Sequence, residues 1–108
     1  MEQLAIVEKR GANYILFELT GAINSYNIDE LQSRVFEEIK SNNVVLDLSQ
    51  ISNIDSTGMG MIFAAFNDGL ESGKKLYLMN MSFSAMNTVK ETGFMDAFNV
   101  IQSVTEVQ

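Results

Sequence analysis

The sequence predicts an α/β domain in which a small sheet of about four to five strands carries packed helices. Three observations lead to this fold class. Apolar residues alternate near the N-terminus, with the period of two that is typical of strands. Later segments repeat apolar residues every three or four positions, as an amphipathic helix does. Short, continuously apolar runs lie between them and are typical of strands covered on both faces.

The N-terminal residues are predicted to form a β-hairpin. Residues 4–9 alternate in the manner of a short strand, and residues 14–19 form a second run rich in β-forming side chains. Gly11-Ala12-Asn13 between them is a turn signal. We expect Gly21 to end the second strand.

A helix and a buried strand follow the hairpin. The helix is predicted from apolar residues at three- and four-residue steps, namely Ile28, Leu31, Val35, Phe36 and Ile39. Asn27, with Glu30 three residues later, resembles a capping box, and residues 41–43 mark the stop. Residues 44–48 then form an apolar run typical of a central strand.

Two further helices and two strands complete the predicted order. A helix over residues 57–72 ends at Gly73 and packs through an inner face of Ile62, Ala65, Phe66 and Leu70. A buried strand at residues 76–79 precedes a helix over residues 82–92, whose periodic positions are Phe83, Met86, Val89 and Lys90. A last edge strand is predicted from Phe98, Val100 and Ile101. This alternation favours one layered α/β domain over residues 1–108.

Composition narrows the chemistry that this chain can perform. It has 108 residues with no histidine and no cysteine, which excludes histidine general bases, thiolate nucleophiles, thiolate zinc sites and disulfides. A weak nucleotide hydrolase is disfavoured as well, because the chain lacks a phosphate-binding loop. We therefore expect a non-enzymatic protein with no cofactor and no metal. The absence of disulfides from so small a domain is typical of a reducing cytoplasm.

The charge balance argues against two classes of partner. The 14 acidic and 7 basic side chains give a formal charge of −7, which opposes binding to nucleic acid and to anionic membrane surfaces. No apolar stretch reaches the roughly 18 residues that cross a bilayer, and Met1-Glu2-Gln3 does not begin like a signal peptide. These observations predict a cytoplasmic protein.

The segment Asn53-Ile54-Asp55-Ser56-Thr57-Gly58-Met59-Gly60 carries recognisable chemistry. It follows the buried strand and opens the second long helix, at the edge where open α/β sheets bind ligands or partners. Ser56 or Thr57 is expected to cap this helix. The free N–H groups of a first helical turn also favour an added phosphate.

Two glycines in that turn cost roughly 1 kcal/mol each in helix propensity, which calls for a reason. Gly58 and Gly60 would let a partner backbone approach closely, and Met59 between them is expected to be exposed. A structural alternative stays open, because Asp-Ser-Thr is a common cap and small residues also let a helix lie close to a sheet. On the residues alone, Ser56 is either a modified or contacted serine or part of an ordinary cap.

In this context, the motif at residues 55–60 resembles the signature of the STAS domains of bacterial anti-sigma-factor antagonists. The similarity extends over nearly the whole chain, including Leu19-Thr20-Gly21, Gly73-Lys74-Lys75-Leu76 and Glu91-Thr92-Gly93-Phe94. The resemblance implies a partner-switching protein. Its serine after the aspartate, here Ser56, is phosphorylated by an anti-sigma factor serine kinase and dephosphorylated by a metal-dependent serine phosphatase. The unphosphorylated form would bind the kinase, and phosphorylation would break that complex.

The same resemblance implies a partner-binding surface made of Asn24, Asp55, Ser56, Thr57, Gly58, Met59 and Gly60. One position departs from the family pattern, since Gly21-Ala22-Ile23-Asn24 stands where an acidic pair is usual. Asn24 keeps a hydrogen-bonding side chain but carries no charge. The missing carboxylates at Ala22 and Asn24 leave an alternative open, in which the chain is an unphosphorylated STAS scaffold or ligand-binding module.

Overall fold

The two N-terminal strands form the predicted hairpin. In the computed structural model, which describes residues 3–108, β1 (Ala5–Arg10) pairs antiparallel with β2 (Ile15–Ile23). The turn between them closes through the Gly11 N–H, which donates to the Tyr14 carbonyl oxygen at 3.0 Å. Met1 and Glu2, which entered the signal-peptide expectation, lie outside the described residues.

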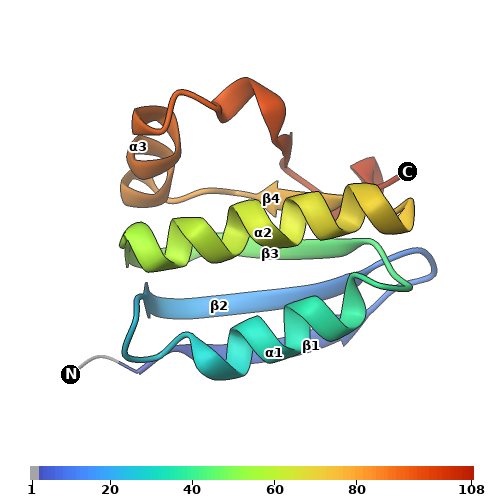
Figure 1. Ribbon diagram of the computed structural model, residues 1–108, viewed down its shortest axis with the longest axis horizontal. Helices are drawn as coiled ribbons and strands as arrows, with labels where there is room; N and C mark the ends of the chain where they lie inside the picture. Colours follow the sequence, from blue (N-terminus) through green and yellow to red (C-terminus); the bar gives the residue numbers. More distant parts are fainter. Residues whose placement is uncertain (1–2) are drawn as a thin grey trace.

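The remaining strands extend the sheet in parallel, in the spatial order β1-β2-β3-β4-β5. These strands are β3 (Val44–Ile54), β4 (Leu76–Met79) and β5 (Asn99–Ile101). The helices are α1 (Asp29–Glu38), α2 (Ser56–Ser72) and α3 (Phe83–Glu91), with short 3-10 turns η1 (Met95–Ala97) and η2 (Val104–Glu106). Figure 1 shows α1 and α2 in front of the sheet, with α3 near the start of α2. The predicted α/β class is confirmed.

The larger hydrophobic core lies between the sheet and the helices. Phe17, Leu46 and Leu78, from three neighbouring strands, are fully buried in it. Helix α1 contributes Leu31 and Val35, also fully buried, so the main predicted contacts of this helix are confirmed. The three- and four-residue spacing of these side chains is what turns one side of α1 toward the strands.

The opposite face of the sheet has a smaller apolar layer, which the C-terminal segment covers. Val45 and Tyr77 are buried in this layer together with Val107. The Gln108 N–H donates to the Tyr77 hydroxyl at 3.1 Å, and Asn13 Nδ2 donates to the Val107 carbonyl oxygen at 3.2 Å. These bonds hold the end of the described chain against the sheet.

Two strands run further than the sequence indicated. β2 does not end at Gly21 but continues to Ile23, because Gly21 adopts a φ of 118° where the pairing with β3 is irregular. β3 continues to Ile54 and does not stop at residue 48. As a result, the last residues of both strands, Ile23 and Ile54, pair with each other.

Three of the periodic positions predicted for α2 and α3 are in fact exposed, namely Leu70, Phe83 and Lys90. Leu70 is 61% exposed, because Gly69 takes the inward position and leaves only 3.2 Å between an added Cβ and Ile39 Cγ1. Phe83 is 84% exposed, since α3 packs through Ala85 and Val89. Within residues 3–108, no helix is both long and apolar enough to cross a membrane.

Candidate functional site

The motif at residues 55–60 lies at the carboxyl ends of the parallel strands, as predicted. The Asp55 N–H donates to the carbonyl oxygen of Ile23 at 3.1 Å, so the last residue of β2 fixes the point where α2 begins. Asp55 and Ser56 therefore lie beside the turn that connects β2 to α1.

Asp55 caps helix α2, and the prediction that Ser56 or Thr57 does so is wrong. The backbone of Asp55 is extended (φ −88°, ψ −177°), and its Oδ1 accepts a hydrogen bond from the Gly58 N–H at 2.9 Å. A carboxylate here also matches the positive end of the helix dipole. Ser56 and Thr57 thus become the first two helical residues, and both are exposed.

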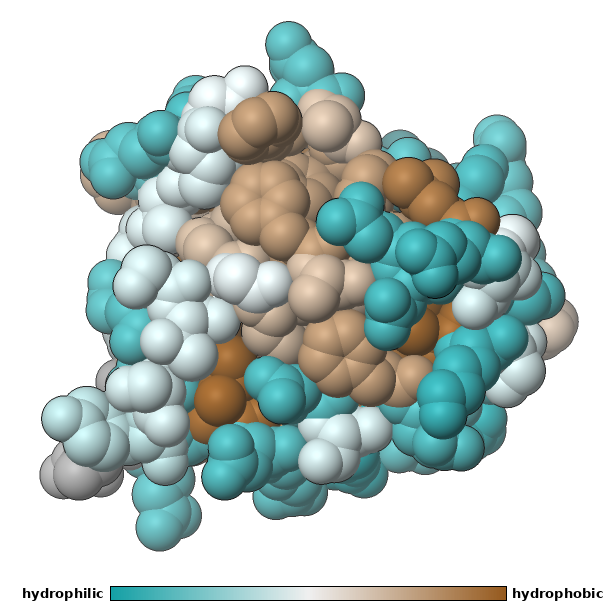
Figure 2. Space-filling view, in the orientation of Figure 1, coloured by the Kyte–Doolittle hydropathy of each residue, from teal (hydrophilic) through white to brown (hydrophobic). Residues whose placement is uncertain are grey.

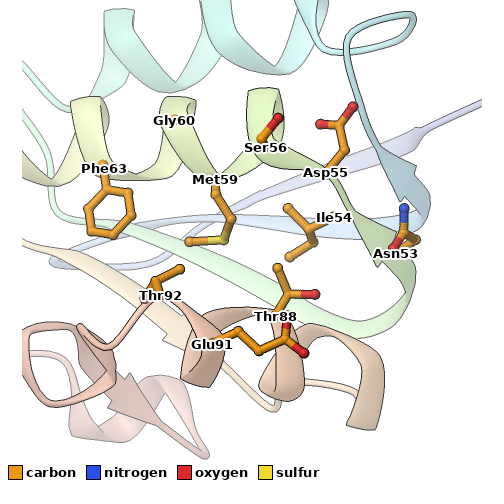
Figure 3. A pocket seen from close by; sticks show the side chains of 10 residues that line it. All are labelled: Asn53, Ile54, Asp55, Ser56, Met59, Gly60, Phe63, Thr88, Glu91 and Thr92. Atoms are coloured by element: carbon orange, nitrogen blue, oxygen red, sulfur yellow. The ribbon is translucent and has the colours of Figure 1, made fainter.

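The Ser56 hydroxyl is left available by this arrangement. Because Asp55 satisfies the cap, no hydrogen bond engages the Ser56 side chain among residues 3–108. Figure 3 shows the Ser56 and Asp55 side chains at the start of α2, above the groove that separates this helix from α3. Chemistry on this hydroxyl therefore breaks no hydrogen bond among the described residues.

The second carboxylate oxygen of Asp55 ties α2 to the β2–α1 turn. Oδ2 accepts from the Ser25 N–H at 3.3 Å. Within the turn, Asn24 Oδ1 accepts from the Tyr26 N–H at 2.9 Å, and the Asn24 N–H donates to Asn27 Oδ1 at 3.0 Å. Asn24 is consequently half-buried, with its side-chain oxygen engaged inside the turn.

Two features of this turn differ from the sequence predictions. Asn27 and Glu30 do not form a capping box, because the N-cap of α1 is Ile28 and Asn27 Nδ2 donates to the Ala22 carbonyl oxygen at 2.8 Å. Tyr26, which sequence reasoning missed, is 79% exposed beside the Asp55 contact. The signal for it was an aromatic residue in an otherwise polar turn.

The two glycines of the motif have different surroundings. Gly58 is buried, and a Cβ there would lie 2.8 Å from both the Ile23 carbonyl oxygen and Ile54 Cγ2. Gly58 thus lets α2 pack on the strand ends, and it is not open to a partner backbone as predicted. Gly60 is exposed, with no atom within 4 Å of an added Cβ. Only Gly60 fits the predicted role.

Met59 is buried, with 6% of its surface exposed, so the prediction that it is exposed is wrong. It lines a groove of about 600 Å³ between α2 and α3 (Figure 3), to which Thr88 and Glu91 also contribute. Among the predicted partner-binding residues, three are thus exposed, two half-buried and two buried. The exposed residues are Ser56, Thr57 and Gly60, the half-buried ones are Asp55 and Asn24, and the buried ones are Gly58 and Met59.

The arrangement suits a covalent modification or a protein contact. An exposed hydroxyl in the first turn of a helix lies near free N–H groups and the positive dipole end, which favour a phosphate. Residues 3–108 contain no group of three or more acidic side chains placed to hold a metal ion.

Comparison with known proteins identifies a family and a set of similar folds. A family model for the STAS domain matches residues 3–107. A candidate anti-sigma factor antagonist from Thermotoga maritima has a TM-score of 0.84 at 17% identity, covering 94% of this chain and 89% of that one. An anti-sigma factor antagonist from Mycobacterium paratuberculosis has a TM-score of 0.77 at 16% identity, covering 95% of this chain and 89% of that one. The anti-sigma factor antagonist SpoIIAA, in its unphosphorylated form, has a TM-score of 0.74 at 14% identity, covering 94% of this chain and 92% of that one.

Proposed function

The chain belongs to the STAS domain family, and from this membership we propose that it is an anti-sigma factor antagonist that acts by partner switching. Its unphosphorylated form binds an anti-sigma factor that is also a serine kinase, and this binding releases the target of the kinase. Phosphorylation of Ser56 breaks the complex, and a metal-dependent serine phosphatase restores the binding form.

In this proposal, residues 1–108 act as one non-enzymatic unit in the cytoplasm. The protein is the substrate of its kinase and phosphatase and carries out no reaction itself. Its formal charge of −7 supports protein partners over nucleic acid or anionic membrane surfaces.

The state of the Ser56 hydroxyl is the observation that carries the proposal. The side chain is exposed in the first turn of α2, and Asp55 satisfies the helix cap. A kinase can therefore modify Ser56 without removing a hydrogen bond that holds the fold together. SpoIIAA, which has a similar fold, was solved in its unphosphorylated form, and this supports phosphorylation as a variable among such proteins.

A phosphate on Ser56 would change the surface without changing the fold. It adds about −1.5 to −2 charges beside Asp55. The free N–H groups of the first turn stabilise this charge within the domain. A partner that packs against a small hydroxyl and the open Gly60 instead meets a bulky dianion. The cost is on the order of several kcal/mol, and each 1.4 kcal/mol or so is tenfold in affinity.

One observation favours a second candidate, a STAS scaffold or ligand-binding module that is not phosphorylated. Ala22 and Asn24 have no carboxylate to present near Ser56. Ala22 is also buried, and Asn24 uses its side-chain oxygen within the turn. A kinase that requires an acidic pair there would leave this chain unmodified. The chain would then bind its partner constitutively.

Phosphopeptide mass spectrometry on the protein isolated from its native cells separates the two candidates. We expect phosphate on Ser56 and not on the neighbouring exposed Thr57. The same peptide from a Ser56→Ala variant should carry none. Absence of phosphate under several growth conditions would favour the scaffold.

Retention of the co-purified kinase gives a second readout. Ser56→Ala should retain it, whereas Ser56→Glu should weaken the interaction by about tenfold or more, because it mimics the added charge. Ser72→Glu, at the exposed far end of the same helix, is the matched control and should behave like the wild type. Equal retention by the two glutamate variants would overturn the switch.

A further inference from the structure

A second, apolar hollow lies next to the groove beside Ser56, along the same side of α2. It measures about 480 Å³ and is lined by Phe66, Phe94 and Phe98 among others. Phe63 lines both hollows, so the two meet at this ring. We call the two hollows together the α2 groove. Figure 2 shows hydrophobic side chains gathered in the middle of this face of the molecule.

Phenyl rings form much of the α2 groove. Phe98 is buried and contacts Phe63 and Phe66 at centroid distances of 5.1 and 5.4 Å. Phe94 meets Phe63 edge to face at 5.6 Å and remains 57% exposed. Leu70, one turn beyond Phe66 on the same side of α2, is also exposed. Apolar side chains that gather at a surface in this way mark an interaction site.

The segments that form the two walls are acidic. Helix α2 contains Asp68 and Glu71 but no lysine or arginine. The opposite segment, residues 83–98, contains Glu91 and Asp96 against a single basic residue, Lys90. The two segments together therefore carry four carboxylates and one lysine.

The one basic residue does not reach into the groove. Thr88, Glu91 and Thr92 line it, and a helical rotation of about 100° per residue puts Lys90 on the opposite side of α3. Among the described residues, the lining of the two hollows contains two carboxylates, Asp55 and Glu91, and no lysine or arginine.

We propose that the α2 groove binds a lysine- or arginine-rich amphipathic helix of a partner protein. The apolar side of that helix packs on the phenyl rings, and its cationic side chains face the carboxylates of Asp55 and Glu91. The lining residues of α2 run from Ser56 to Asn67, a rise of about 16 Å, which matches about three turns of a docked helix. Anionic ligands and acidic segments are disfavoured by the same charges.

This contact goes beyond the proposed switch and responds to charge in the opposite sense. A phosphate on Ser56 adds negative charge at one end of the groove and strengthens its attraction for a cationic helix. The kinase contact at Ser56 is broken by that same charge. Ser56→Glu therefore separates the two proposals, and the failure of one leaves the other standing.

Fluorescence anisotropy with a synthetic peptide tests the groove. The probe is an amphipathic leucine–lysine helix of about 18 residues, long enough to hold helical structure. A leucine–glutamate helix and a scrambled leucine–lysine peptide serve as peptide controls. We expect only the leucine–lysine helix to bind the full chain, and Ser56→Glu to bind it as tightly as the wild type or more tightly.

Variants of the full chain then locate the peptide. Phe94→Ala should bind about tenfold more weakly, because it removes an exposed anchor of the groove. Phe83→Ala is the matched control and should bind like the wild type, since Phe83 is an exposed phenylalanine of α3 outside the groove. Glu91→Lys should weaken binding more than Glu37→Lys, which reverses an exposed charge on α1.

Several results would overturn the proposal. They are equal losses of affinity for the leucine–lysine helix in Phe94→Ala and Phe83→Ala, equal binding of the leucine–lysine and leucine–glutamate helices, and no binding of either helix. A dimer of the chain in sedimentation experiments that Phe94→Ala abolishes would assign the groove to a second copy instead.

Discussion

One side of helix α2 packs on the sheet, and the other side faces α3 and solvent. The sheet side carries Met61, Ile62 and Ala65, all buried, and its glycines lie where a larger side chain would meet the strands or α1. The outer side carries the exposed Ser56 and Gly60 and leads into the α2 groove. Both sides belong to one helix of 17 residues, yet different requirements decide which residue occupies each position.

The difference teaches how to interpret the motif at residues 55–60. Asp55 and Gly58 hold the start of α2 on the strand ends. Ser56, Thr57 and Gly60 form its surface. A short sequence that resembles a functional signature is thus partly a packing signature, and substitutions on the two sides of α2 should have opposite consequences.

The largest effect is expected from Gly58→Ala. A Cβ would lie 2.8 Å from a backbone oxygen that cannot easily move, and overpacking of this kind outweighs the gain in helix propensity. We expect the free energy of unfolding in urea to fall by about 2 kcal/mol. An unchanged free energy of unfolding would show that the strand ends move to accommodate the added Cβ. It would contradict the close packing inferred for the sheet side of α2.

A smaller effect is expected from Asp55→Ala, which removes the helix cap and the contact with the Ser25 N–H together. The free energy of unfolding should fall by about 1 kcal/mol, and the Ser25 amide should exchange faster with solvent. Asp55→Asn keeps one acceptor oxygen and should lose less stability. Asp68→Ala, at an exposed position of the same helix, is the control and should change stability by less than about 0.5 kcal/mol. An unchanged exchange rate of the Ser25 amide in Asp55→Ala would contradict the inference that Asp55 ties α2 to the β2–α1 turn.

The smallest effect, and one of opposite sign, is expected from Gly60→Ala. An added Cβ meets nothing within 4 Å, so alanine brings its helix propensity without a clash. Urea denaturation should show a gain of about 0.5 to 1 kcal/mol. The same substitution at Gly58 is the matched comparison. A loss of stability at both positions would contradict the division between the two sides of α2.

The periodic parts of the fold were predictable because burial repeats with the backbone period. The hairpin and the buried face of α1, with Leu31 and Val35, followed from that repeat. The positions where β2 and β3 end did not follow from that repeat. Gly21 reads as a terminator, but at a φ of 118° it continues the pairing as an irregularity. Most of residues 49–54 are exposed, so no apolar run marks the second half of β3.

The position of the candidate site was predictable, since it follows a buried strand and opens a helix. The roles of its side chains were not. Aspartate, serine and threonine are all favourable N-caps, so only the point where β3 ends decides that Asp55 takes this place. Met59 is buried beside a groove that α3 helps to line, and the spacing within α2 says nothing about where α3 packs.

The segment after β5 has a consequence for handling the protein. Through Val107 and the bond from the Gln108 N–H to the Tyr77 hydroxyl, it lies on the face of the sheet opposite α2. A linker joined after Gln108 therefore departs on the side away from Ser56 and the α2 groove. Immobilisation by this end on a sensor chip presents the whole outer side of α2 to an analyte, provided that the linker leaves Val107 seated against the sheet.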